Sequence, residues 1–288
     1  MVTRILYYIF IIPISLLPYP LLYGLSDFLF IVIYYGIGYR RKVVFANIRN
    51  SFPDKSEAER GKIAKKFYRH FCDLTLESLK IFTISEKEVR KRMVFNNVDV
   101  PNKYFDQKRS IVIAGGHFNN WELLAVGYAD AIKHKGAALY APLTNLFFDA
   151  KMRATRSKYG LNMISIKKAR EFFEESKNEL TATIFGIDQS PGNPDRCYWT
   201  RFLNQDTGVQ FGAEKFAKEY DMPVVWGRIN KVKRGHYSFD FIEVTDQPRQ
   251  TAHGEIMERA TRMLEKDILD EPAYWLWTHK RWKHKRPA

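Results

Sequence analysis

The chain has 288 residues, of which 45% are hydrophobic and 27% charged, and its formal net charge is +14. This length can bury a sizeable core, which excludes a small scaffold held together by cross-links. Its two cysteines, Cys72 and Cys197, lie far apart, which excludes a disulfide framework and a structural zinc site and indicates a reducing compartment. The excess of basic residues predicts an anionic partner: nucleic acid, a phospholipid surface, an acidic protein or a phosphorylated substrate.

The N-terminal segment is strongly apolar. No charged residue occurs from Ile5 to Ser26, a run of 22 residues, and Asp27 is the only charge between this run and position 40. Such a run is long enough to cross a hydrocarbon core as a helix, although its prolines predict a kink. Because no clear cleavage site follows, an uncleaved membrane anchor over 1–39 is preferred to a signal peptide or a buried core hairpin. The basic residues after the anchor predict that the rest of the chain, 40–288, is one domain that faces the cytoplasm.

Helical patterns follow the anchor. A short basic helix is predicted over 42–50, ended by Phe52-Pro53, and a long amphipathic helix over 56–82. The apolar stripe of the long helix predicts that one of its faces packs on the core. Residues 93–98 are predicted to form an edge strand.

Short apolar strands then alternate with helices. This alternation predicts an α/β fold with a mostly parallel central sheet flanked by helices. Two later strands are predicted to pair as a hairpin through Arg234-Gly235. The predicted strands are 111–114, 137–141, 161–165, 181–186, 223–230 and 236–244, and the predicted helices are 120–133, 146–158, 167–179, 210–220 and 252–269.

The segment 113–122, Ile-Ala-Gly-Gly-His-Phe-Asn-Asn-Trp-Glu, carries the strongest chemical signal. Its strand ends in two glycines, which permit a sharp bend, so His117 is expected at the mouth of the sheet. A histidine there, oriented by a carboxylate, can take a proton from a hydroxyl at neutral pH. Glu122 is five residues away, outside the i+3 and i+4 helical positions, and would have to reach back from the first helical turn. The alternative is a histidine that caps the helix beside a surface glutamate.

Asp188 is a second candidate, because it follows strand 181–186. Functional groups of open α/β sheets gather at the carboxyl ends of strands, so Asp188 and His117 are expected to converge in one crevice. A turn-forming aspartate close to Pro191 is the alternative. The serine elbow of hydrolases is absent from the sequence, so the attacking group is expected to belong to a substrate.

Two further clusters are basic. Arg153 and Arg156 share one face of the helix predicted over 146–158, where guanidinium forks could bind phosphate or carboxylate, or simply be solvated. The C-terminal stretch 274–286 interleaves tryptophans with Lys and Arg, a pattern typical of membrane–water interfaces and also of nucleic-acid binding. The apolar N-terminus favours lipid, so no nucleic-acid partner is expected.

Five segments match one known family: Asn47–Pro53, Gly115–Glu122, Asp188-Gln189, Gly208–Val225 and Trp275–Lys283. Together they resemble the lauroyl and myristoyl (late) acyltransferases of lipid A biosynthesis, within the His-x4-Asp/Glu acyltransferases. The resemblance covers nearly the whole chain, including the anchor. The chain differs from many relatives in one segment. Where they carry a phenylalanine-rich block, it has the segment Arg201 to Gly208, and this difference bears on the identity of the acceptor and on acyl-chain length.

The resemblance implies that His117 is the general base and Glu122 its orienting carboxylate. It places Arg156 and Asp188 in the active site as residues that bind substrate. The neighbouring helix terminus, the basic helix face and the Asp-Gln loop supply the remaining candidates for substrate binding: Asn119, Arg153 and Gln189.

The resemblance implies no metal and no cofactor beyond the co-substrate, an acyl thioester of acyl carrier protein or of coenzyme A. The acceptor would be a hydroxyl of a lipid A precursor at the cytoplasmic face of a bacterial inner membrane. The implied partners are therefore acyl carrier protein, the phospholipid bilayer and this anionic lipid. The alternatives are an aminolipid or glycolipid acceptor, a lipid hydrolase in which water replaces the alcohol, and a non-catalytic basic protein that binds anionic lipid.

Overall fold

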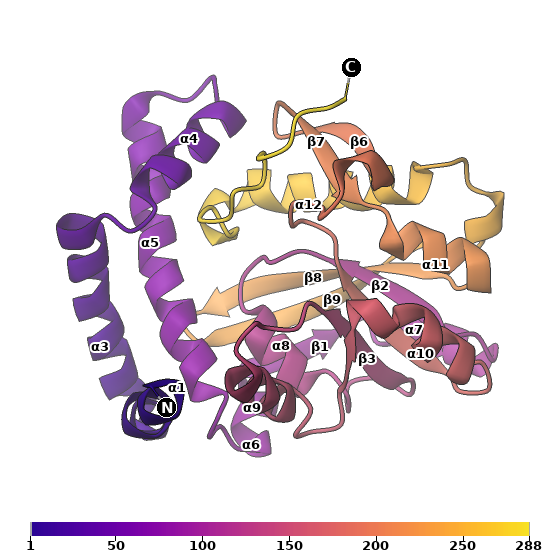
Figure 1. The fold of residues 1–288 in the computed structure, drawn as a ribbon, viewed down its shortest axis with the longest axis horizontal. Helices are drawn as coiled ribbons and strands as arrows, with labels where there is room; N and C mark the ends of the chain where they lie inside the picture. Colours follow the sequence, from indigo (N-terminus) through magenta and orange to yellow (C-terminus); the bar gives the residue numbers. More distant parts are fainter. Residues whose placement is uncertain (1, 288) are drawn as a thin grey trace.

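A computed structural model describes residues 2–287 and is built around one central sheet (Figure 1). The strands of this sheet are β1 (Met93–Asn96), β2 (Ile111–Gly115), β3 (Lys135–Tyr140), β4 (Asn162–Ser165), β5 (Thr181–Gly186), β8 (Val224–Lys233) and β9 (His236–Thr245). Their order is β1-β9-β8-β2-β5-β3-β4. Strands β8, β2, β5, β3 and β4 run parallel, whereas β9 is antiparallel to β8 and carries β1 at the edge. The predicted α/β fold with a mostly parallel sheet is confirmed.

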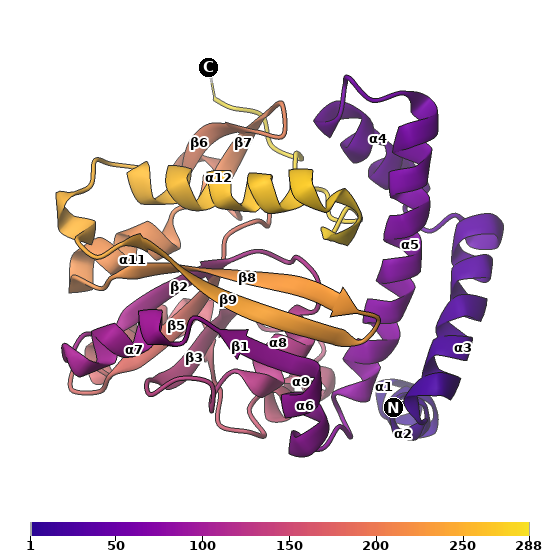
Figure 2. The same ribbon diagram turned by 180° about the vertical axis from the view of Figure 1, so that it is seen from behind.

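Helices cover both faces of the sheet, and two hydrophobic clusters fill the two layers (Figures 1 and 2). Strand β2 contributes side chains to both clusters: Val112 and Ala114 pack into the first cluster, and Ile111 and Ile113 pack into the second. Successive side chains of a strand point to opposite faces, so a strand buried on both faces must be apolar throughout. The helices are α4 (Arg41–Ser51), α5 (Glu57–Lys80), α6 (Glu86–Arg92), α7 (Asp99–Asp106), α8 (Trp121–Gly127), α9 (Leu146–Arg156), α10 (Ala169–Glu175), α11 (Gly212–Tyr220) and α12 (Glu255–Asp270).

The long helix α5 begins where the sequence predicts. Ser56 and Glu59 form a reciprocal capping box that satisfies free N–H groups of the first turn. Other helices are shorter than predicted: α8 ends at Gly127 rather than at position 133. A β-carbon at Gly127 would lie 2.8 Å from a Val89 methyl group, so this glycine allows α8 to approach α6 closely, at the cost of a poor helix former.

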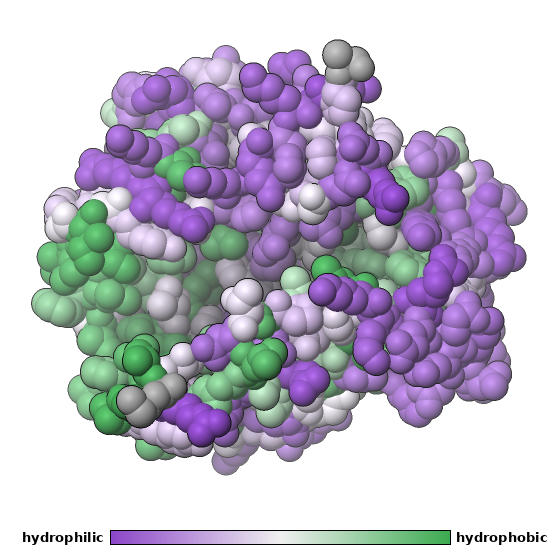
Figure 3. Space-filling model, viewed as in Figure 1, coloured by the Kyte–Doolittle hydropathy of each residue, from purple (hydrophilic) through white to green (hydrophobic). Residues whose placement is uncertain are grey.

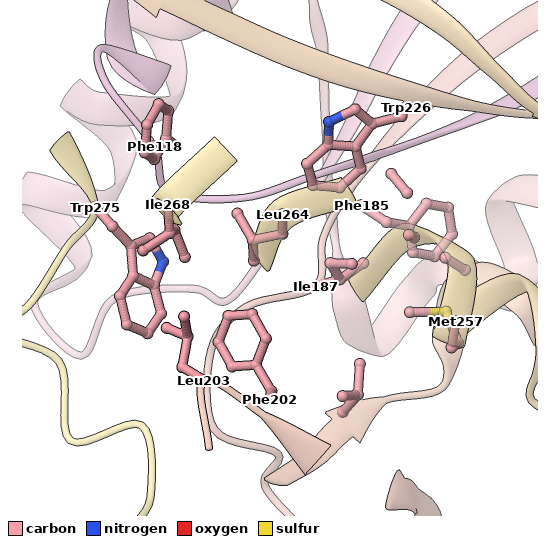
Figure 4. Packing of buried hydrophobic residues seen from close by; sticks show 14 of the residues in the cluster. Phe118, Phe185, Ile187, Phe202, Leu203, Trp226, Met257, Leu264, Ile268 and Trp275 are labelled. Atoms are coloured by element: carbon pink, nitrogen blue, oxygen red, sulfur yellow. The ribbon is translucent and has the colours of Figure 1, made fainter. Parts of the chain in front are cut away.

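A two-stranded antiparallel hairpin, β6 (Cys197–Phe202) and β7 (Gln205–Gln210), lies outside the main sheet and was not predicted. Its turn residues, Leu203 and Asn204, both have positive φ angles. Two-residue turns of this kind match the twist of a hairpin but usually contain glycine, and this turn contains none. The hairpin covers α12, whose Leu264 and Ile268 pack near Phe202 (Figure 4).

The C-terminal segment corrects a sequence interpretation. Its tryptophans were predicted at a membrane interface, but Trp275 and Trp277 are 2% and 0% exposed. Both indoles have hydrogen-bond acceptors inside the protein, Asp188 for Trp275 and the Pro272 carbonyl for Trp277. A tryptophan whose N–H is satisfied internally gains more from a packed core than from an interface.

The N-terminal segment is helical and bends at Pro18. It comprises α1 (Val2–Leu6), η1 (Tyr7–Ile11), α2 (Ile12–Leu16), α3 (Tyr19–Ile31) and η2 (Val32–Ile37). The continuous helix from Tyr19 to Ile37 is long and apolar enough to cross a membrane, and only 17% of its most apolar window is buried. It is therefore not the buried core hairpin that the sequence left open.

The polar residues of α3 face α5, beside which α3 stands in Figure 1. The Ser26 hydroxyl donates to Asp73 at 2.7 Å, and the Tyr23 hydroxyl donates to Glu77 at 2.9 Å. Glu77 also accepts from Tyr237 at 2.8 Å and from the Asn120 amide at 2.7 Å. One buried carboxylate thus joins the N-terminal helix, α5, strand β9 and the residue that caps α8.

We expect Glu77→Ala to lower the free energy of unfolding by about 3 kcal/mol, because it leaves three buried donors without an acceptor. Urea unfolding in detergent, followed by tryptophan fluorescence, measures the change. Glu86→Ala is the matched control, since Glu86 pairs with Arg90 on the exposed surface of α6, where such pairs contribute little. An equal decrease in the free energy of unfolding in the two variants would show that the hydrogen bonds to Glu77 do not stabilise the fold more than a surface ion pair does.

Candidate active site

His117 lies just beyond the carboxyl end of β2, as predicted. The preceding Gly116 lies against α12, where a β-carbon would come within 2.7 Å of a Leu264 methyl group. The chain can therefore turn over α12 only without a side chain at this position. The turn aims the backbone N–H of His117 at Asp188, to which it donates at 2.8 Å.

Asp188 is the carboxylate that holds the His117 ring. It follows β5, the strand next to β2, so the two loops meet at one edge of the sheet. Asp188 Oδ1 lies 2.6 Å from His117 Nδ1, while Oδ2 accepts from the His117 backbone and, at 2.8 Å, from the Trp275 indole. Burial alone would raise the pKa of Asp188, but His117 and these donors outweigh it and lower the pKa to about 2. The predicted convergence of the two residues is confirmed.

This pairing fixes the chemistry of the His117 ring. Because the ionised Asp188 can only accept a hydrogen bond, Nδ1 carries the proton and Nε2 presents its lone pair. Burial disfavours the imidazolium, but the Asp188 carboxylate favours it more strongly, so the pKa of His117 is raised. The Gln189 amide nitrogen lies 3.2 Å from Nε2, and the imidazole side chain is 24% exposed. A substrate hydroxyl that replaced Gln189 at Nε2 would face the lone pair of a base whose pKa is raised by its carboxylate.

Glu122 does not hold His117, which corrects the predicted pairing. It lies in the first turn of α8 and pairs with Arg156 of α9, with Nε–Oε2 and Nη2–Oε1 distances of 2.8 and 2.5 Å. The i, i+5 spacing turns Glu122 toward α9, whereas Asp188 approaches the ring from the neighbouring strand. Glu122 is still close enough to favour the imidazolium form of His117. Its part in catalysis stays a prediction.

Arg156 lies close enough to His117 for its positive charge to offset part of the rise in the pKa of the imidazole. Burial disfavours its charge, but Glu122 more than compensates, so the pKa of Arg156 is raised and the guanidinium stays charged. The bidentate contact holds its planar fork in one orientation. Arg153, the other arginine predicted here, is exposed and forms no ion pair within residues 2–287.

Asn119 is not placed in the site. Its side chain is 1% exposed, and its amide donates to the Ile229 carbonyl at 2.8 Å. Its φ angle of 56° lies in the left-handed region, which asparagine tolerates better than most residues. Asn119 therefore shapes the turn that carries His117, rather than contacting substrate.

Two residues of the C-terminal segment belong to the site and were not assigned to it from the sequence. Trp275 holds Asp188, and His279 Nε2 accepts from the Ser190 backbone at 3.0 Å, which ties the Asp188 loop to the chain end. Their signal was present in the motif Trp275–Lys283, but its alternation of aromatic and basic residues favoured a membrane interface instead. Within residues 2–287 no group of three metal-ligating side chains occurs.

One face of the molecule is hollowed (Figure 3). Figure 3 shows a depression in the middle of this face, with hydrophobic surface along its rim on the side of the N-terminal helices. Large apolar side chains are exposed on the elements around it, including Phe10 at 54%, Leu143 at 43% and Leu146 at 82%. The α1–α9 contact closes this rim, where Asn145 donates to the Thr3 hydroxyl at 2.8 Å. A depression with an apolar rim suits a substrate with a hydrocarbon chain.

Comparison with known proteins identifies the family of the chain. The family model described as bacterial lipid A biosynthesis acyltransferase matches residues 1–284. The chain is 24% identical over 276 residues to a lipid A biosynthesis acyltransferase of Haemophilus influenzae, and 21% identical over 279 residues to a lipid A biosynthesis palmitoleoyltransferase of Escherichia coli. Each comparison covers 93% of this chain and 86% of the relative. The chain is thus an acyltransferase and belongs to the bacterial lipid A biosynthesis acyltransferase family.

Proposed function

We propose that this enzyme transfers a fatty acyl chain from the thioester of an acyl carrier protein to a hydroxyl of a lipid A precursor. The observation that carries the proposal is the His117–Asp188 pair, which presents the lone pair of Nε2 close to the Arg156 guanidinium. The depression with an apolar rim on the surface supports a lipid substrate. The family supports lipid A as the acceptor. The reaction would take place at the cytoplasmic face of the inner membrane.

The transfer needs one base and no nucleophile from the protein. His117 Nε2 takes the proton of the acceptor hydroxyl while that oxygen attacks the thioester carbonyl carbon. The tetrahedral intermediate then collapses, the carbon–sulfur bond breaks, and the imidazolium returns the proton to the thiolate that leaves. Asp188 stabilises the transient imidazolium, as the aspartate does in a serine hydrolase triad.

Arg156 is proposed to bind negative charge during this step. Its guanidinium is held by Glu122 through only one edge, so its remaining donors are free to meet the intermediate's oxyanion or an acceptor phosphate. Glu122 then acts by fixing the arginine. This role would explain a carboxylate five residues after the base that does not touch it.

Acyl carrier protein is the proposed carrier of the acyl donor because its negative charge complements the positive charge of this enzyme. Acyl carrier proteins are acidic, and a net charge of +14 would attract one and steer it to the enzyme. Arg153 is well placed to contribute, since it is exposed on α9, the helix that also carries Arg156.

Membrane association is proposed through the N-terminal helices. Their polar residues are bound to the domain, whereas large apolar side chains point outward, among them Leu21 at 61%, Phe28 at 62% and Ile37 at 70% exposed. Exposed apolar area of this extent is costly in water and marks an interaction surface. The arrangement would place the enzyme against the lipid that contains its acceptor.

The direct test supplies the purified enzyme with a lipid A precursor and with acyl carrier protein or coenzyme A thioesters of the same chain. We expect mass spectrometry to show one added acyl group on the precursor and faster transfer from the carrier protein. Transfer only to an aminolipid or a glycolipid would reject the proposed acceptor. Release of free fatty acid without acceptor, at the rate of transfer, would indicate a hydrolase.

The pH dependence of kcat/KM follows from the raised pKa of His117. A general base must be deprotonated, so we expect activity to fall on the acid side with a midpoint above 6.5, the ordinary value for histidine. Asp188→Asn removes the main cause of the rise, and burial then outweighs the smaller contribution of Glu122, so the acid limb should move to lower pH. An acid limb that stays in place in this variant would contradict the assignment of His117 as the titrating base.

A further inference from the structure

A cavity of about 590 Å³ lies away from His117, where α3, α5 and the turn between β8 and β9 meet. Figure 2 shows the β8–β9 turn reaching α5 beside α3. The wall from α5 consists of Lys66, Arg69, His70 and Asp73, which share one face of that helix. None of the proposed catalytic residues lines this cavity, so it is a separate feature of the molecule.

Positive charge exceeds negative charge in the wall of the cavity: four cationic side chains face two carboxylates. The carboxylates of Asp27 and Asp73 are both engaged by Arg234, at 2.7 and 2.6 Å. Arg69 has no carboxylate within 4.0 Å in the described part of the chain, and Lys66 only touches Glu271 at 3.4 Å where both are exposed. Lys231 also lies 3.9 Å from Asp73. The wall of the cavity still keeps a net positive charge, and Arg69 is its cation without a carboxylate partner among the described residues.

His70 adds a buried donor without an acceptor. Lys231 Nζ lies 3.1 Å from His70 Nδ1, and because an ammonium can only donate, the ring proton must be on Nε2. Nε2 has no hydrogen-bond partner among residues 2–287, although the residue is only 3% exposed. Burial, and then Lys231, lower the pKa of His70, which keeps the ring neutral. An unpaired buried N–H is costly, and the ring that carries it belongs to a residue that lines the cavity.

The mouth of the cavity is apolar and belongs to the N-terminal helix. Ile31 and Tyr35 line it and are 56% and 61% exposed on the outer surface of this helix. A ligand with an anionic head and hydrocarbon chains matches both parts: the head meets the cations, and the chains follow the helix. A soluble anion would leave the apolar mouth unused.

We propose that this cavity binds the phosphate headgroup of an anionic membrane lipid, with Lys66, Arg69 and His70 contacting the phosphate and the acyl chains lying along Ile31 and Tyr35. The site would hold a bilayer lipid apart from the reacting acceptor. It would thereby set the orientation of the enzyme on the membrane.

Binding to vesicles of phosphatidylcholine, with and without phosphatidylglycerol, tests the proposal by flotation. We expect wild type to prefer the anionic vesicles and Lys66→Gln/Arg69→Gln to lose about 30-fold in affinity for them, as about 1 kcal/mol per cation near the surface implies. Lys167→Gln/Lys215→Gln is the matched control, since it removes two exposed lysines of η3 (Ile166–Lys168) and α11, which do not line the cavity. An equal loss in the control would mean that only overall charge matters and would overturn the proposal.

His70→Phe separates the cavity from general electrostatics, because it removes a neutral buried donor and changes no surface charge. We expect about tenfold weaker binding to anionic vesicles, with circular dichroism confirming the fold. If this variant fails to fold, the comparison of the two double variants decides. Unchanged binding in a folded His70→Phe protein, or calorimetric binding of inorganic phosphate as tight as that of vesicles, would reject a lipid headgroup site.

Discussion

His117→Ala is expected to lower kcat for acyl transfer about 10²–10⁴-fold, the usual contribution of a positioned general base. The acceptor hydroxyl has a high pKa, so it attacks the thioester slowly unless its proton is removed during the attack. Neither His279 nor His70 can take over: His279 Nε2 accepts from the Ser190 backbone, and His70 lies at the separate cavity. Initial rates with a radiolabelled acyl donor measure the effect.

Binding and folding should survive the change to alanine. The imidazole is partly exposed, and its main anchor, Asp188, keeps the Trp275 and backbone donors. We therefore expect an unchanged circular dichroism spectrum and unchanged binding to membrane vesicles. Activity within threefold of wild type in a folded His117→Ala protein would exclude this histidine as the base.

Asp188→Asn is expected to reduce kcat by a similar factor through a different cause. Oδ2 accepts both the Trp275 indole and the His117 backbone, so the asparagine oxygen can take its place and preserve the loop. Its amide then replaces Oδ1 and donates to His117 Nδ1. The ring proton is forced to Nε2, which removes the lone pair that the hydroxyl needs. In the Ser-His-Asp triad the same substitution costs about 10⁴-fold in kcat.

Glu122→Gln is the matched comparison, since it also turns a carboxylate beside the site into an amide. It weakens the contact with Arg156 but leaves the hydrogen bond between His117 and Asp188 intact. We expect a higher KM and a kcat reduced less than in Asp188→Asn, because ground-state and oxyanion contacts are disturbed while the base remains. A larger loss of kcat in Glu122→Gln than in Asp188→Asn would indicate that Glu122, and not Asp188, orients the His117 ring.

The central sheet could be predicted because each of its strands can be recognised from its own short stretch of sequence. Strands 111–114 and 181–186 are short apolar runs, and a strand buried on both faces must have that composition. The hairpin of β6 and β7 could not be predicted in the same way. Its strands are half polar, and its turn depends on two residues that take positive φ angles without glycine.

The site was predictable in part. His117 and Asp188 each follow a strand, and adjacent parallel strands bring their carboxyl ends together, so sequence reasoning placed both correctly. Which carboxylate holds the ring depends on side-chain direction, and the closer residue in sequence, Glu122, turns to α9 instead. Trp275 lies 87 residues from Asp188, and no local pattern connects an indole to a carboxylate at that distance.

Titration of His117 by ¹⁵N nuclear magnetic resonance tests the central claim most directly, because it observes the ring itself. The account predicts a neutral ring protonated at Nδ1 that titrates above pH 6.5, and a shift to the Nε2-protonated form in Asp188→Asn. A wild-type ring protonated at Nε2, or a pKa below 6.5 that Asp188→Asn leaves unchanged, would contradict the claim that Asp188 prepares His117 to deprotonate a lipid hydroxyl.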